Sequence, residues 1–312
     1  MTVDLHQHLW PEPFLAALRS RRTAPRLEGW ELHLPGERPY AIDPVHHKPG
    51  ARAAQAAEDG DELVLLSPSA ALGLDRLPPP EARELAAAWL DGALSLPAPF
   101  RAWAMAGTVQ PDPQALEHAL SAGAVGLELP ADLLAAPGGF DRLAPLLDVL
   151  EAAGRPLLVH PGPAGSQDVP GRPVWWAPVV PYVAQLHAAW WAWAADGRAR
   201  HPRLPVCFVA LGGLGPLHGE RQRARGGEGR AIDPLTFVET SSYGLLAVDS
   251  VIRVLGIDVV CHGSDRPYAA PPRLGFGAAA LHAIESANPG RLLSQFCPPA
   301  KPAGYAPQEV YA

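Results

Sequence analysis

Short apolar runs alternate with longer helical patterns along the chain. The runs are rich in valine and leucine and almost continuous, as in strands that are buried on both faces of a sheet. Apolar residues at helical spacing between them predict helices at residues 51–59, 81–96, 113–122, 140–153, 178–195, 245–255 and 275–286. The predicted strands lie at residues 2–6, 62–66, 102–109, 124–129, 156–160, 205–211, 236–240 and 257–262.

This alternation predicts an α/β fold, a distorted (β/α)8 TIM barrel, because the runs give eight strands with helices between them. Two smaller doubly wound domains would produce a similar alternation. No linker-like change of composition divides the chain, however. We therefore expect one barrel domain over residues 1–312.

Two stretches interrupt the alternation. Residues 28–44 hold two short β-like runs on either side of Pro35 and Gly36, which predicts a small β-hairpin inserted after strand 1. Residues 212–233 are rich in glycine and arginine, which predicts a mobile loop after the sixth strand.

Composition and charge narrow the class of protein. Hydrophobic residues make up 48% of the chain, which is enough for a large core, and the net charge of −7 disfavours nucleic-acid binding. Cys207, Cys261 and Cys297 are far apart and odd in number, so a disulfide framework is not expected and a reducing compartment is. The sequence has no signal-peptide pattern and no membrane-spanning apolar stretch, so we expect a cytoplasmic protein.

The strongest chemical signal is a pair of histidines at the end of the first predicted strand. His6 and His8 are two residues apart, so their side chains point to the same face of a strand. His160 ends the fifth apolar strand, and Asp265 follows the eighth. Each residue alone has an ordinary structural explanation, but the carboxyl ends of barrel strands meet where active sites of this fold lie. Three imidazoles and a carboxylate there predict a site for one divalent metal ion, with zinc the first expectation.

Four motifs resemble the amidohydrolase superfamily, of the amidohydrolase-2 type. They are DLHQHLWP at residues 4–11, LLVHP at 157–161, HPRLPVCF followed by two glycines and a proline over 201–216, and GSDRP at 263–267. The closest branch resembles aminocarboxymuconate-semialdehyde decarboxylase. This resemblance implies a distorted barrel with one divalent metal, held by His6, His8, His160 and Asp265.

The sequence departs from that branch at the end of the sixth strand. The branch carries a histidine there that helps to activate a metal-bound water, and this chain has Ala210. Alanine can neither accept a proton nor bind a metal. His218, in the predicted loop just beyond, either folds back over the barrel mouth as a catalytic substitute or is an exposed loop residue.

Three further residues are candidates for substrate binding. The resemblance places Arg221 near the substrate of a neighbouring subunit, and thus implies a homodimer, although a solvated loop arginine is the alternative. Glu128 ends the fourth strand and is expected to point into the barrel mouth, where it orients a histidine, contacts substrate or pairs with an arginine. Trp176 follows the fifth strand and could line the pocket. Burial of the helix that bears Trp190 and Trp193 is expected in a helix–helix or subunit interface.

These residues lead to one function and two alternatives. The first is a metal-dependent hydrolase of a small carboxylated ester, lactone or amide, in which Asp265 carries a proton beside a metal-activated water. The second is a non-oxidative decarboxylase of a small aromatic or dienoic acid. The third is a non-catalytic relative that lost turnover with the histidine of the sixth strand. No nucleic acid or membrane is expected as a partner.

Overall fold

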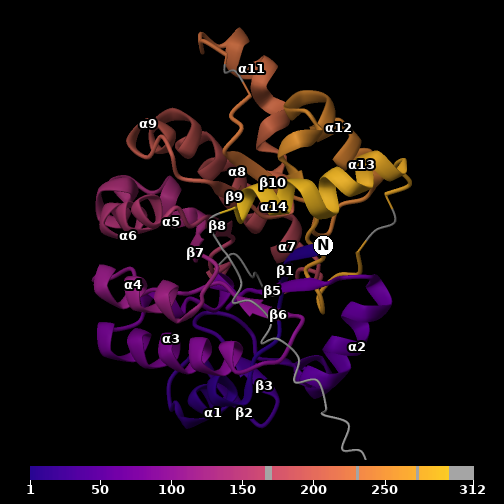
Figure 1. Ribbon diagram of the computed structural model, residues 1–312. Helices are drawn as coiled ribbons and strands as arrows, with labels where there is room; N and C mark the ends of the chain where they lie inside the picture. The colour runs from indigo at the N-terminus through magenta and orange to yellow at the C-terminus, as the bar shows by residue number, and fades with distance from the viewer. Residues whose placement is uncertain (166–170, 230–231, 272–273, 295–312) are drawn as a thin grey trace, which may run out of the picture.

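The computed structural model describes residues 1–165, 171–229, 232–271 and 274–294, and a parallel β-barrel lies at its centre (Figure 1). Two parallel sheets form the barrel, one with the order β1-β5-β6 and one with the order β11-β10-β9-β8-β7. The strands are β1 (Val3–Gln7), β5 (Leu63–Leu66), β6 (Phe100–Ala102), β7 (Leu127–Pro130), β8 (Leu157–His160), β9 (Val206–Phe208), β10 (Thr236–Glu239) and β11 (Val260–Cys261).

Two parallel bridges close these sheets into one barrel. Ala104 bridges to Leu127, and Gln7 bridges to Arg266. The second seam is reinforced by the Leu5 N–H, which donates to the His262 carbonyl at 3.1 Å. The eight strands and their helices confirm the predicted (β/α)8 barrel.

The predicted third strand is misplaced. The strand is β6, and it ends at Ala102, where the prediction began. Trp103 and Ala104 follow the strand and are fully buried, so their apolar side chains belong to the core although they lie outside the strand. Thr108 then donates to the Asp75 carbonyl and carboxylate, which holds the loop. Apolar composition alone cannot separate a buried strand end from a buried loop.

Helices surround the barrel (Figure 1). The last predicted helix extends further than expected, because a π-helical turn at Ala283–Ala287 leads into α14, where Asn288 Nδ2 donates to the carbonyls of Ile257 and Val260. The main helices are α1 (Glu12–Ser20), α2 (Pro49–Asp59), α3 (Pro79–Leu94), α4 (Pro113–Ala122), α5 (Ala131–Ala135), α6 (Gly139–Ala153), α8 (Pro181–Ala192), α12 (Leu245–Leu255), α13 (Ala278–His282) and α14 (Asn288–Leu292).

The predicted hairpin at residues 28–44 is part of a larger insertion. β2 (Arg26–Glu28), β3 (Glu31–His33) and β4 (Tyr40–Ala41) form an antiparallel three-stranded sheet. The sheet follows helix α1 and does not come directly after β1. It starts two residues earlier than predicted, because Arg26 pairs with His33.

The segment at 212–233 is not simply a loop. It begins within α10 (Ala210–Gly213) and continues through a 3-10 turn (Gly215–His218) into α11 (Gly219–Ala224); residues 230–231 lie outside the described residues. Gly213 has a φ of 58°, and a side chain there would collide with the backbone of α8. The glycines therefore permit a close approach to α8, and α11 projects from the barrel (Figure 1).

The tryptophan-rich segment predicted as one helix divides at Pro181 into α7 (Trp176–Val179) and α8. Trp193 is buried beside Phe140, and Trp190 packs on Phe208 at 5.3 Å between ring centroids. These tryptophans therefore pack within the chain. Across the described ranges, no helix has both the length and the apolar character needed to cross a bilayer.

Candidate metal centre and cavity

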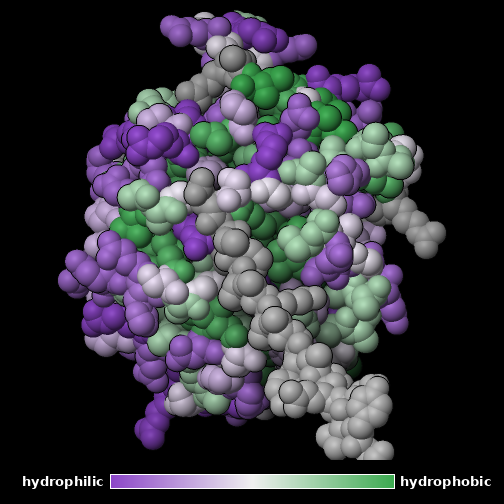
Figure 2. Space-filling model, viewed as in Figure 1, coloured by the Kyte–Doolittle hydropathy of each residue, from purple (hydrophilic) through white to green (hydrophobic). Residues whose placement is uncertain are grey.

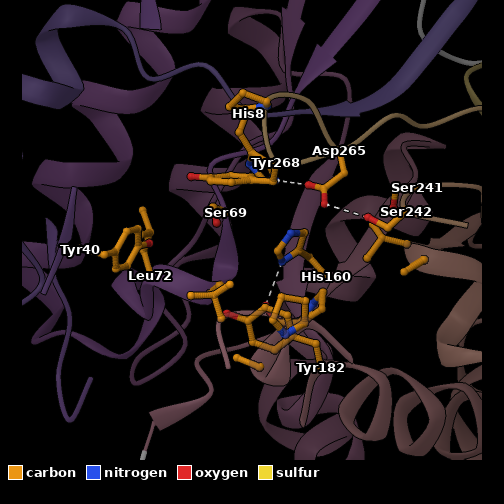
Figure 3. A pocket seen from close by; sticks show the side chains of 18 of the residues that line it. His8, Tyr40, Ser69, Leu72, His160, Tyr182, Ser241, Ser242, Asp265 and Tyr268 are labelled. Carbon is orange, nitrogen blue, oxygen red and sulfur yellow. Dashed lines mark hydrogen bonds and ion pairs between the residues drawn. The ribbon is translucent and has the colours of Figure 1, made fainter. Parts of the chain in front are cut away.

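Four of the predicted site residues meet at the carboxyl end of the barrel, and Figure 3 shows three of them, His8, His160 and Asp265. His6 and His8 come from β1, His160 ends β8, and Asp265 follows β11. The candidate ligand nitrogens of the three histidines all lie within 4.8 Å of one another. The Asp265 Oδ1 atom lies 3.2 Å from His8 Nε2 and 3.9 Å from His6 Nε2.

The histidines are oriented for binding a metal. His6 Nδ1 lies 3.4 Å from Glu239 Oε1, His8 Nδ1 lies 3.3 Å from the Ser67 carbonyl, and His160 Nδ1 lies 2.9 Å from the Pro161 carbonyl. In each ring, Nδ1 contacts a protein oxygen and Nε2 is left to face the space between the three rings. Metal-ligating histidines have this arrangement, because the bond at the other nitrogen sets the tautomer. The residues therefore fit one divalent ion.

Electrostatics at the cluster favour a cation. Burial lowers the pKa of His8 and lowers that of His160 further, so both rings are neutral and able to ligate. Burial also lowers the pKa of His6, but the hydrogen bond and charge of Glu239 outweigh it and raise that pKa to about 9. The carboxylates of Glu239 and Asp265 therefore create a negative potential at the three rings.

Glu239 is a site residue that the sequence reasoning missed. It is completely buried near the end of β10 and accepts hydrogen bonds from the Ala210 N–H at 2.7 Å and from Ser241. A side chain at Gly263 would overlap its carboxylate, so the glycine makes room for it. An acid at the end of an apolar strand was the available signal, and it resembles the signal that identified Asp265.

Buried polar contacts also fix the seam between β1 and the Asp265 loop. Asp4 Oδ1 accepts from the His6 N–H at 3.0 Å and from the Ser264 N–H at 3.1 Å. The Asp265 N–H donates to the His6 carbonyl at 2.9 Å, and Arg52 donates to the His8 carbonyl at 2.7 Å. The metal-ligand candidates are therefore held by backbone contacts on both sides of the seam.

Ala210 lies in the wall of the cavity, two residues after β9. His218 does not: its ring packs against His187 at 4.7 Å between centroids, and it is absent from the cavity lining. The 3-10 turn that ends at His218 contacts α8 and α12, which directs the residue away from the barrel mouth. The structure therefore does not support His218 as the substitute for the missing histidine.

The other three predicted residues do not line the main cavity. Glu128 is buried, and it accepts hydrogen bonds from Ser67 and from the Ala70 N–H at 2.6 Å, so it supports the loop after β5. Trp176 lies under the guanidinium of Arg172, with 4.0 Å between the guanidinium carbon and the ring centroid. Arg221 is exposed on the projecting helix α11.

The cluster forms the floor of a cavity of about 950 Å³. Ser241 and Ser242 lie beside Asp265, and the Ser242 hydroxyl donates to Asp265 Oδ2 at 3.3 Å (Figure 3). The rest of the wall comes from the inserted sheet, the loop after β5 and α7–α8, and it includes Tyr40, Leu72 and Tyr182. A buried polar floor under an apolar wall is typical of a site for a small organic ligand.

Several solved protein structures share this architecture. IDCase from Metarhizium anisopliae has a TM-score of 0.74 at 16% identity, covering 95% of this chain and 97% of its own. The 5-carboxyvanillate decarboxylase LigW from Sphingomonas paucimobilis has a TM-score of 0.70 at 17% identity, covering 94% and 98%. A dihydroxybenzoic acid decarboxylase from Polaromonas, with bound manganese and the inhibitor 2-nitroresorcinol, has a TM-score of 0.68 at 17% identity, covering 94% and 96%.

The chain has the fold of these decarboxylases. Identities of 16–17% establish the architecture and leave the chemistry to be argued from the site. Two of these neighbours, LigW and the Polaromonas protein, are named decarboxylases. No protein-family model matches the sequence, and no curated protein matches it.

Proposed function

We propose that this protein is a metal-dependent decarboxylase that releases CO2 from an aromatic carboxylic acid without oxidation. The observation that carries the proposal is the convergence of His6, His8, His160 and Asp265 on the cavity floor. Two structural neighbours are named decarboxylases of aromatic acids, and one of them holds manganese. We therefore propose a divalent ion such as manganese, where the sequence alone suggested zinc.

When bound, the ion supplies positive charge to oxygen atoms of the substrate. The chain's own residues do the rest: the three histidines would hold the ion, and Asp265 takes up a proton from water and passes it to the ring carbon that bears the carboxylate. The bond between that carbon and the carboxylate then breaks, and its electron pair stays on the ring. The products are CO2 and the protonated ring, so neither an oxidant nor a reductant is needed.

Two named neighbours favour decarboxylation over hydrolysis, and the floor offers Asp265 as the proton-transfer group for either reaction. Hydrolysis of an ester, lactone or amide needs a base beside an attacking water, and loss of such a base typically lowers rates by about 10²–10⁴-fold. Ala210 cannot act as that base and His218 packs outside the cavity, so hydrolysis would also depend on Asp265. Proton delivery to carbon requires one acid at the floor, and Asp265 lies there beside His8.

The test is CO2 release by the manganese-loaded protein from a panel of hydroxylated aromatic acids with one or two rings, with methyl esters of the same acids assayed in parallel. We expect CO2 from at least one acid, and Asp265→Asn is expected to reduce that rate by about 10²–10⁴-fold. Asp258→Asn, in the turn before β11 and absent from the cavity lining, is the matched control. Ester hydrolysis without CO2 release would establish the hydrolase instead, and neither activity would favour a non-catalytic relative.

We also propose a homodimer, in which Arg221 acts across the subunit interface. Arg221 is exposed on the projecting helix α11 and is absent from the cavity of its own chain. Hydrophobic side chains gather near α12 (Figure 2), where the side chains of Leu245 and Leu246 are 43% and 84% exposed. Light scattering at micromolar concentration should give twice the chain mass, and Leu246→Glu should shift it toward the monomer. A monomeric wild-type mass would contradict the proposal.

A further inference from the structure

The cavity is larger than a single-ring acid requires. Its volume of about 950 Å³ lies near the upper end of the roughly 300–1,000 Å³ range of sites that enclose drug-sized ligands. The floor residue Asp265 lies beside Ser242 (Figure 3). Tyr40 and Leu72 lie at the other end from Ser241 and Ser242 (Figure 3).

The outer end of the cavity is apolar and comes from segments far apart in the sequence. The inserted sheet and the chain around it contribute Leu34, Tyr40 and Ile42, and the loop after β5 contributes Leu72. Val174 and Val179 come from the region of α7, and both are exposed. Exposed apolar side chains that line a cavity lose contact with water when an apolar ligand covers them, which favours binding.

Charge at this outer end does not favour a second anionic group on the ligand. Arg38 lines the wall, but Glu37 and Asp43 line it as well. The two acids outnumber the arginine, so a second carboxylate would meet a net negative wall. The negative end of the ligand therefore belongs at the floor.

We infer that the substrate is a monocarboxylic acid with an apolar body larger than one six-membered ring, a biaryl or fused-ring acid. The inference rests on the proposed function, because it places the carboxylate at the histidine floor. The apolar body then lies between Tyr40 and Leu72, and an aromatic ring against Tyr40 adds a specific ring–ring contact.

The experiment compares benzoate with biphenyl-4-carboxylate by titration calorimetry on the manganese-loaded protein. We expect the larger acid to bind about tenfold or more tightly, because a second ring buries further apolar surface. Tyr40→Ala should remove most of that difference while leaving benzoate affinity within about twofold. Leu72→Trp should block the larger acid by filling its space. Val109→Ala, exposed in the loop after β6 and absent from the cavity lining, is the matched truncation control.

Each outcome decides the inference. Equal or weaker binding of the larger acid, binding of neither acid, or equal effects of Tyr40→Ala and Val109→Ala would overturn it. Far-ultraviolet circular dichroism checks that both cavity variants fold. Tyr40→Ala removes a contact, whereas Leu72→Trp fills space, so the two variants test the inference in different ways. Titration with manganese alone, together with the CO2 assay, tests the proposed function separately, so failure of the size preference is distinguishable from failure of the metal site.

Discussion

The floor and the outer wall of the cavity are built in different ways. The floor residues stand at the ends of barrel strands, and their polar atoms contact backbone groups or buried acids. The outer wall comes from the inserted sheet and from α7, where Tyr40 and Val179 are exposed. The floor is therefore positioned by the barrel itself, whereas the wall can change without disturbing it. Barrel enzymes acquire different substrates through such loop variation.

Removal of a floor histidine should have the largest effect. His8→Ala takes away one of the three clustered imidazoles, so we expect loss of bound manganese and a fall in CO2 release of about 10³-fold or more. Elemental analysis and the CO2 assay measure both. His118→Ala, exposed on α4, should change neither, and Tyr40→Ala should leave metal content intact. Metal loss from the Tyr40 variant would break the distinction between floor and wall.

The free energy of unfolding should depend on pH through Glu128, which lies buried near the floor. Burial raises its pKa from 4.5 to about 7, so between these pH values the folded state binds more protons than the unfolded chain. Its contribution to the free energy of unfolding is complete below pH 4.5 and is lost as the pH rises through 7, by roughly 3 kcal/mol.

Denaturant unfolding across pH 4–8 measures this change. Glu128→Gln should flatten the decline of the unfolding free energy between pH 4.5 and 7, whereas Glu117→Gln, exposed on α4, should leave the profile of the wild type. If the Glu128 variant kept the full decline, the pH dependence would come from other buried acids. Asp61 is one of these, because burial raises its pKa to about 7.

Ala210 stands where a histidine is expected, and restoring that histidine tests whether the site lacks an acid–base group. Its φ of 48° lies in the left-handed region, where histidine is enriched relative to most residues, and it faces the cavity. Ala210→His should therefore be tolerated and should raise turnover by about tenfold through a new acid–base group. Ala184→His, exposed on α8, is the control. Unchanged activity would mean that Asp265 is sufficient for proton transfer.

The residue pattern was enough to predict the barrel and its candidate ligands. Apolar runs that alternate with helical periodicity determine which faces must be buried, and the helices at 113–122 and 245–255 match α4 and α12. Two histidines at a strand spacing of two must share a face, so the pairing of His6 and His8 follows from local geometry. The ends of parallel strands meet at one rim, which places His160 and Asp265 near them.

Only the tertiary structure decided which remaining polar residues support the floor or reach the cavity. Glu239 supports the floor because β10 brings it against His6, from which it is 233 positions away in the sequence. His218 was excluded because the turn that carries it packs on α8 and α12. The outer wall depends on the path of the inserted sheet, which follows α1. Local periodicity specifies the faces of strands and helices, whereas packing between distant segments determines which loop side chains meet.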